Sequence, residues 1–347
     1  MNYKQPLKVC ICVPAYNSEE TIGKTLESLL KQSYENIIIK IINNCSSDNT
    51  AKIVEQYMCK DQRIQLFSFD KLVPAAENFD RCIEFAEGIY TCIFHSDDVY
   101  LPTIVEKEVA FLESHRDVGA VFTYANVINE NDVITSALLP NKNLKKQETY
   151  NFDELFPLIL KYNNCFVTPS AMVRTKIYKE EIIKHKRKKS FNDAFDVDVW
   201  LRILKKYKVG FIFERLMSYR LSIHSTSFRK LLEYDNTITD SMFNVLETHM
   251  IEGKAKHLLQ NVDYINLKAR NKLGNVMKAY FNADYDSAKK VIRELPSENL
   301  SSKNDIIKHL LSIIIHIPSP KFIRKLLIYV KYYGIMKGQF NRIQLDK

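Results

Sequence analysis

The sequence predicts an α/β protein with a mostly parallel sheet covered by helices on both faces, followed by a helical C-terminal region. From Lys8 to Leu101, short β-branched apolar runs alternate with stretches that repeat apolar residues at helical spacing. Such alternation indicates crossover connections, which require parallel strands. After about Lys230 the pattern is almost wholly helical, so we expect two domains in the 347 residues.

The expected elements follow one another at short intervals. Strands are predicted at residues 8–13, 37–42, 63–67 and 90–94, with helices at 20–31, 50–59 and 75–86 between them. Beyond Leu101 the pattern is looser. It predicts helices at 102–114, 152–161 and 197–204 and a strand near 119–124.

Composition favours a folded protein of a reducing compartment. Hydrophobic residues make up 46% and charged residues 26%, enough apolar surface for a sizeable core. The seven cysteines include no Cys-x-x-Cys pair, which indicates free thiols. Residues 1–8 lack the apolar stretch of a secretion signal, and no apolar run is long enough to span a membrane. A cytoplasmic location is therefore expected.

The net charge of +9 is concentrated near the C-terminus. Residues 301–347 contain nine Lys or Arg against two Asp, a net charge of +7. Within them, residues 321–333 show an apolar helical stripe with basic residues beside it. This segment either lies on an anionic membrane surface or packs on the preceding domain. Nucleic-acid binding is disfavoured, because no aromatic and basic recognition motif accompanies the charge.

Two adjacent carboxylates, Asp97 and Asp98, directly follow the strand predicted at residues 90–94. Ligands of doubly wound sheets bind beyond the carboxyl ends of the strands. Two like charges that close favour a cation between them, and a diphosphate leaving group needs such a cation. The alternative is a turn with two solvated aspartates.

Short polar residues follow the first two predicted strands. They suit the edges of a base and its ribose, but they are also common in ordinary turns. These residues are Pro14, Ala15, Tyr16 and Asn17 after the first strand, and Asn43, Asn44 and Asp48 after the second.

A third cluster places Asp196 and Asp198 beside the only tryptophan, Trp200, where a helix is predicted to begin. A carboxylate at a helix N-terminus, partly screened from water, can act as a general base. Alternatively, either acid caps the helix.

In this order the three clusters resemble the family 2 glycosyltransferases of the GT-A fold, over roughly residues 8–229. Val13-Pro-Ala-Tyr-Asn17 resembles the family's opening motif at the donor base, and Asn43-Asn-Cys-Ser-Ser-Asp48 resembles its second loop motif. Ser96-Asp97-Asp98 resembles its divalent-metal motif.

The resemblance implies a role for each acid. Asp97 would contact the donor ribose or sugar, and Asp98 would ligate Mn²⁺ or Mg²⁺ on the donor diphosphate. Asp196 would deprotonate the acceptor hydroxyl in a direct displacement that inverts the anomeric centre. Asn78, on the helix before the metal loop, falls at a recurrent donor-binding position of the family.

The sequence departs from the family pattern at three places. Asn43 stands where the family usually has Asp, and Phe195 stands where an acid commonly precedes the base, which leaves Asp198 as a substitute for Asp196. His224, which follows Tyr219-Arg220, would complete the metal site, although it lies further along than usual and a lone histidine is more often structural.

We therefore expect a GT-A catalytic domain at residues 1–229, with a donor half at about 1–100 and an acceptor half at about 101–229. A helical region at 230–347 would follow. The expected activity is inverting transfer of a hexosyl or N-acetylhexosaminyl group from a nucleotide sugar, with UDP as the expected nucleotide. The acceptor would be a hydroxyl of a glycan or lipid-linked sugar in surface polysaccharide biosynthesis, in the cytoplasm or peripherally at the inner membrane face.

Other classes of protein fit less well. A catalytically silent relative that only binds a partner is the main alternative. A dinucleotide oxidoreductase is disfavoured, because no Gly-x-Gly-x-x-Gly follows the first strand. A nucleotidyltransferase would want a Gly- and basic-rich phosphate loop there, which is absent.

Overall fold

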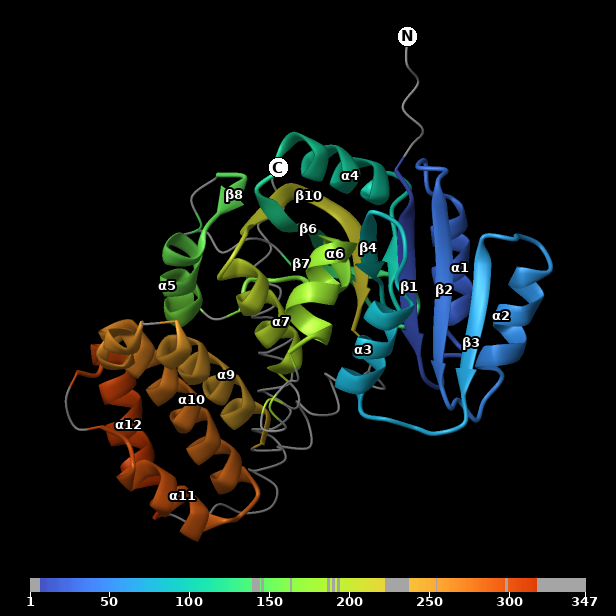
Figure 1. The fold of residues 1–347 in the computed structure, drawn as a ribbon. Helices are drawn as coiled ribbons and strands as arrows, with labels where there is room; N and C mark the ends of the chain where they lie inside the picture. Colours follow the sequence, from blue (N-terminus) through green and yellow to red (C-terminus); the bar gives the residue numbers. More distant parts are fainter. Residues whose placement is uncertain are drawn as a thin grey trace. The chain divides into compact units, whose positions relative to one another are not determined.

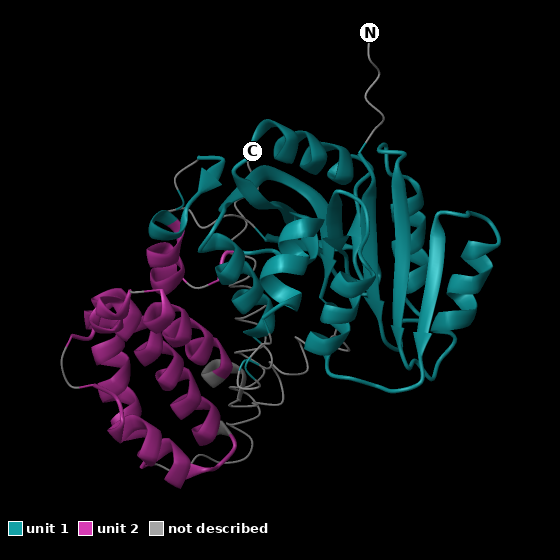
Figure 2. Cartoon of the chain, viewed as in Figure 1, with its two compact units in different colours: residues 1–154, 166–222 teal, residues 155–165, 223–347 magenta. Residues whose placement is uncertain are grey.

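The computed structural model describes residues 7–138, 144, 147–162, 164–185, 188, 191, 194–221, 237–253, 255–296 and 299–316. The chain divides into two compact units (Figure 2). Unit 1 comprises residues 1–154 and 166–222, and unit 2 comprises 155–165 and 223–347. The boundary predicted at residue 229 lies outside the described residues, and it stays a prediction.

The part of the sheet built from the first four strands of unit 1 is parallel throughout (Figure 1). The strands pair in the order β3-β2-β1-β4. Their bounds are Val9–Ala15 for β1, Ile37–Asn44 for β2, Ile64–Phe69 for β3 and Tyr90–Ile93 for β4. The four predicted strands are therefore confirmed, and so are the helices between them: α1 (Ile22–Leu30), α2 (Thr50–Met58) and α3 (Ala75–Phe85).

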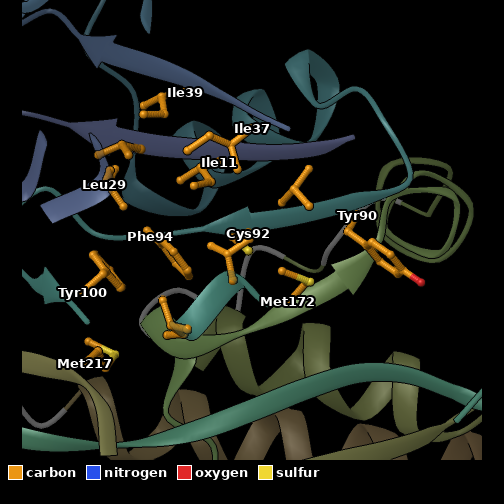
Figure 3. Packing of buried hydrophobic residues seen from close by; sticks show 14 of the residues in the cluster. Ile11, Leu29, Ile37, Ile39, Tyr90, Cys92, Phe94, Tyr100, Met172 and Met217 are labelled. Carbon is orange, nitrogen blue, oxygen red and sulfur yellow. The ribbon is translucent and has the colours of Figure 1, made fainter. Parts of the chain in front are cut away.

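The alternation of side chains along β1 explains how helices cover both faces. Val9, Ile11 and Val13 point into a core with Leu26 and Leu29 of α1, part of which Figure 3 shows. Cys10 and Cys12 point to the opposite face, where the Cys12 thiol donates to the carbonyl of Cys82 in α3 at 3.2 Å. All seven cysteines are free, as the sequence predicted.

The strands after β4 continue the same sheet. Strand β6 (Val118–Ile128) runs parallel to β10 (Lys208–Arg220), and β9 (Met172–Arg174) lies antiparallel between β4 and β6. Three short strands, β5 (Val99–Tyr100), β7 (Ile134–Leu138) and β8 (Thr149–Tyr150), pair antiparallel at its margins. Because β3, β2, β1, β4, β6 and β10 share one direction, the predicted mostly parallel sheet is confirmed.

The helical elements between residues 101 and 221 also agree with the sequence. Three predicted helices are present: α4 (Ile104–Ser114), α5 (Phe152–Tyr162) and α7 (Phe195–Leu204). Three unpredicted segments precede α7: the 3-10 turn η1 (Thr168–Ser170), the short helix α6 (Thr175–Ile177) and the π-helix η2 (Tyr178–Ile183).

Unit 2 is helical in the residues that the structure describes, as predicted. Its helices after α5 are α9 (Thr237–Glu252), the 3-10 turn η4 (Lys256–Gln260), α10 (Val262–Phe281), α11 (Tyr285–Arg293) and α12 (Ser302–Ile314). Asn261, Asp284 and Ser301 cap α10, α11 and α12 by accepting backbone N–H hydrogen bonds. No described helix combines the length and the hydropathy needed to cross a bilayer. The segment 321–333 lies outside the described residues.

Gly88 is a position where the fold tolerates only glycine. Its φ is +81°, and an added Cβ would lie 2.5 Å from the carbonyl oxygen of Lys8. We expect Gly88→Ala to lower the free energy of unfolding by about 2 kcal/mol or more, measured by urea denaturation followed through Trp200 fluorescence. Gly274→Ala is the control, because nothing lies within 4 Å of its added Cβ in α10 and alanine favours helix. A stable Gly88→Ala would contradict the proposed strain.

Candidate active site

Asn17 joins the loops that follow β1 and β2. Its φ of 47° and the φ of 60° at Cys45 are left-handed, which turns each loop back across the strand ends. The Asn17 N–H donates to Ser46 Oγ at 3.0 Å, and the Ser47 N–H donates to Asn17 Oδ1 at 2.9 Å. Because β1 and β2 pair directly, the two predicted motifs lie together.

Most polar side chains of these loops are engaged in holding the loops in place. Asn43 donates to Ser68 Oγ and accepts from the Ser46 N–H, both at 3.2 Å. Asn44 donates to the Val73 carbonyl at 2.8 Å and accepts from the Val73 N–H at 3.0 Å. These hydrogen bonds are the ones that the turn interpretation predicts for the side-chain amides of Asn43 and Asn44. A donor contact of either residue stays a prediction.

Asp48 also fixes the backbone. It accepts N–H hydrogen bonds from Glu19 and Thr50, each at 3.0 Å. Burial acts to raise the pKa of Asp48, but the hydrogen bonds from Thr50 and Glu19 outweigh it and leave that pKa below its ordinary value. A role for Asp48 in donor binding therefore stays a prediction.

The remaining predicted donor contacts differ in accessibility. Tyr16 is 48% exposed and is the side chain of its motif most open to a ligand, while Pro14 is half-buried and Ala15 is buried at the end of β1. Asn78 is buried on α3 and donates to the Ile42 carbonyl at 3.3 Å. Its Oδ1 has no partner within the described part of the chain. The donor roles of these residues are not tested by the structure.

A cluster of three potential metal ligands follows β4. Single ligand atoms of His95, Asp97 and Asp98 lie within 4.8 Å of one another. Helix α1 fixes this loop, because the Thr25 hydroxyl donates to the backbone carbonyls of Ser96 at 3.0 Å and Asp98 at 2.8 Å. The fold therefore holds the two predicted acids beside His95 on a loop that α1 fixes.

Asp98 has a carboxylate oxygen that requires a partner. The side chain is fully buried, and its Oδ1 accepts the Arg220 N–H at 2.8 Å. Its Oδ2 is buried without a hydrogen bond within the described residues. Burial and then the charge of Asp97 hold the pKa of Asp98 well above its usual range, more than Arg220 lowers it. A bound divalent cation would satisfy this oxygen, so the residues present fit Mn²⁺ or Mg²⁺.

His95 was not predicted as a ligand, although it lies only two residues before the acid pair. Its Nδ1 is 3.9 Å from Asp98 Oδ2. Burial lowers the pKa of His95 more than the charges of Asp97 and Asp196 raise it. Neutral imidazole is the form that binds metals. His224, the histidine that was predicted as a ligand, lies outside the described residues.

Arg220 fixes the metal loop from the last strand of the sheet. Its Nε donates to the Asp97 carbonyl at 2.8 Å, and another guanidinium nitrogen donates to the Asn129 carbonyl at 2.8 Å. A third contact is an ion pair with Asp132 at 2.6 Å. The end of β10, the β6–β7 turn and the metal loop are thus held by one side chain.

Asp196 lies in the first turn of α7 and forms a short chain of hydrogen bonds. The Thr168 hydroxyl donates to Asp196 Oδ2 at 2.8 Å, and Trp200 Nε1 donates to the Thr168 hydroxyl at 3.0 Å. Burial raises the pKa of Asp196 more than the hydrogen bonds from Thr168 and Val197 and the charge of His95 lower it. A carboxylate with a raised pKa is suited to general base catalysis.

Asp198 forms an ion pair with Arg202. It is 1% exposed, and its Oδ2 lies 2.9 Å from Arg202 Nε one turn along α7. The N-cap of α7 is Ala194, so neither acid is the N-cap residue. The environment of Asp196 favours it over Asp198 as the base.

The sequence and the fold are similar to those of known glycosyltransferases. The profile described as Glycosyl transferase family 2 matches residues 10–181. WfgD of Escherichia coli, described as a UDP-Glc:alpha-D-GlcNAc-diphosphoundecaprenol beta-1,3-glucosyltransferase, is 27% identical over 75% of this chain and 98% of its own. WfaP of Escherichia coli, with the same description, is 25% identical over 66% of this chain and 85% of its own.

Two solved structures share the fold. TarS of S. aureus in complex with UDP-GlcNAc has a TM-score of 0.52 at 15% identity, covering 94% of this chain and 92% of that chain. The mannosyltransferase PcManGT of Pyrobaculum calidifontis, with GDP-Man and Mn²⁺, also has a TM-score of 0.52, at 11% identity, covering 99% and 89%. The chain belongs to glycosyl transferase family 2 and has the mixed α/β fold of these enzymes.

Removal of the Asp98 charge tests the metal cluster. We expect Asp98→Asn to weaken Mn²⁺ binding by about tenfold or more, because even partners that only orient metal ligands contribute that much. Electron paramagnetic resonance of free Mn²⁺ measures the affinity. The control is Asp61→Asn, which removes an acid from the ion pair with Arg63. Equal affinity of both variants and the wild type would exclude Asp98 as a ligand.

Thr168 provides a test through pH. Loss of its hydrogen bond in Thr168→Val removes stabilisation of the Asp196 carboxylate, so the pKa of Asp196 should rise. Since the base acts deprotonated, the acid limb of kcat/KM should move to higher pH by about one unit, as a hydrogen bond to a charged group is worth about 1.5 kcal/mol or more. Trp200→Phe leaves the Thr168–Asp196 bond intact and should shift the limb less. An unmoved limb in Thr168→Val would argue against Asp196 as the titrating base.

Proposed function

We propose that the protein is an inverting, metal-dependent glycosyltransferase that transfers a sugar from a UDP-sugar to a hydroxyl of a lipid-linked glycan. One observation carries this proposal. The cluster of His95, Asp97 and Asp98 and the carboxylate of Asp196 share one environment, close enough for the charges of His95 and Asp196 to affect each other's pKa. A metal site beside a carboxylate with a raised pKa is what direct displacement at an anomeric carbon requires.

In this mechanism His95, Asp97 and Asp98 would hold Mn²⁺ or Mg²⁺, which when bound neutralises charge on the diphosphate leaving group. Asp196 would accept the proton of the acceptor hydroxyl as its oxygen bonds to the anomeric carbon. The bond between that carbon and the diphosphate oxygen breaks at the same time, and the configuration inverts. Thr168 would keep the Asp196 carboxylate oriented, since its hydroxyl donates to Oδ2.

The names of the similar proteins support the donor and the acceptor. WfgD and WfaP are both described as using UDP-Glc and a GlcNAc-diphosphoundecaprenol. We therefore propose a hexosyl or N-acetylhexosaminyl donor and a polyprenyl-diphosphate sugar as acceptor, in surface polysaccharide biosynthesis. Such an acceptor would place the protein in the cytoplasm, peripherally at the inner face of the membrane.

Asp196 and Asp198 form a matched pair for testing the base. We expect Asp196→Asn to lower kcat by about 10²- to 10⁴-fold, the usual contribution of a general base, with little change in donor binding. Asp198→Asn should mainly lower stability, because it breaks the buried ion pair with Arg202. Release of UDP from UDP-glucose in the presence of a synthetic GlcNAc-diphosphate lipid measures kcat. A larger kcat loss in a folded Asp198→Asn would reverse the assignment.

Calorimetry distinguishes an active enzyme from the silent relative suggested by Asn43 and Phe195. The wild type, titrated with UDP-, GDP- and dTDP-sugars with and without Mn²⁺, should bind a UDP-sugar only with the metal. The same titration of Asp98→Asn should show weakened binding. If a folded protein binds none of these donors, the enzymatic proposal fails and the silent relative is favoured.

A further inference from the structure

Helix α12 (Ser302–Ile314; Figure 1) lies in unit 2 and is apolar both on its core side and on an adjoining exposed side. Toward the core, Leu311 and the C-cap residue Ile315 are 7% and 2% exposed and pack with residues of α10 and α11. On the other side the exposed fractions are 60% for Ile306, 55% for Leu310, 64% for Ile313 and 39% for Ile314. These four residues are called the aliphatic face.

The aliphatic face is one continuous patch. Its members stand at i, i+4, i+7 and i+8, the spacing that brings side chains to the same side of a helix. Among the described residues of unit 2, the other large aliphatic side chains that are exposed are Ile251 on α9 and Val262 on α10, at 57% and 55%. Single exposed residues of that kind are ordinary, but a contiguous patch marks a surface that something covers.

The charges around the patch indicate what covers it. In the described part of α12, Lys303 is exposed beside the aliphatic face, whereas Lys308 and Asp305 are half-exposed. The sequence from 301 to 347 carries a net charge of +7. The complementary surface is therefore apolar inside and negatively charged at its boundary, which describes an anionic phospholipid layer.

We propose that the aliphatic face of α12 inserts into the surface of an anionic membrane. This inference rests on the proposed function, because a polyprenyl-linked acceptor lies in such a membrane. A helix of 13 residues is about 20 Å long, and it would lie along the surface with its charged groups among the headgroups. Four aliphatic side chains are too few for a stable protein interface, which needs about 800 Å² per partner.

The test is flotation of the full chain with phosphatidylcholine vesicles, with and without phosphatidylglycerol. We expect the wild type to float with the anionic vesicles and less so as salt increases. The double variant Leu310→Gln/Ile313→Gln should lower the partition coefficient by about tenfold or more, equivalent to about 1.4 kcal/mol. The matched control, Ile251→Gln/Val262→Gln, makes the same chemical change at positions outside the patch and should float like the wild type.

Three outcomes would overturn the proposal. Equal flotation of both double variants would show that the aliphatic face does not contact lipid. A wild-type dimer in sedimentation velocity that Leu310→Gln/Ile313→Gln dissociates would show that a second copy covers it. A lower urea midpoint of that variant, without any flotation of the wild type, would show that the chain covers its own patch.

A measurement of donor binding distinguishes failure of the membrane proposal from failure of the proposed function. The Leu310→Gln/Ile313→Gln variant should bind UDP-glucose and Mn²⁺ as the wild type does, since the substitutions lie in unit 2. Lost flotation with intact donor binding supports the membrane surface. Flotation without donor binding would leave the lipid contact standing and contradict only the proposed function.

Discussion

The parallel pairing of β1 with β2 on one side and β4 on the other determines where the chemistry lies. Parallel neighbours end at the same edge of a sheet, so three loops that are distant in sequence emerge together. The first loop carries Asn17, the second carries Asp48 and follows Asn43 at the end of β2, and the third carries the acid pair. The apolar faces of β1, buried against α1 and α3, hold this arrangement without contributing to the chemistry.

The site shows how polar groups are divided between structure and function. Asn44 and Asp48 have their oxygens occupied by backbone N–H groups, and such satisfied groups stabilise loops at low cost. Asp98 is the contrasting case, because one of its two oxygens is buried and has no protein partner among the described residues. Leaving a buried acceptor unpaired costs free energy, which a ligand can recover when it binds. This contrast distinguishes the candidate metal loop from the loops whose polar groups already have protein partners.

The sequence predicts the regular part of the fold because periodicity is local. The strands up to β4 and the helices up to α4 were predicted within a few residues, whereas the two-residue strand β5 was not. Strand β10 was missed because its register shifts between Ile212 and Arg215, and a bulge of this kind interrupts the alternation that marks a strand. Strand β9 has only three residues, too few for any period to show.

Only part of the candidate site could be located from the sequence. Asp97 and Asp98 were placed correctly because both follow one strand, and the position of His95 in the same loop could have suggested it as a ligand. The choice between Asp196 and Asp198 could not be made from spacing, since it depends on Thr168 and Arg202, which approach through the fold. Arg220 likewise contacts the loop only through tertiary structure.

The hydrogen bond from Arg220 to Asp98 joins residues 122 positions apart in the chain. A ribosome-bound or truncated chain that ends before β10 would contain Asp97, Asp98 and strands β1 to β4, yet the backbone of Arg220 would not be present to donate to the buried carboxylate. Contacts of such long sequence separation form late, because the intervening chain must first be ordered. On the proposed function, a cation site at Asp98 would therefore be complete only once β10 has folded, and the first four strands alone would not sequester metal.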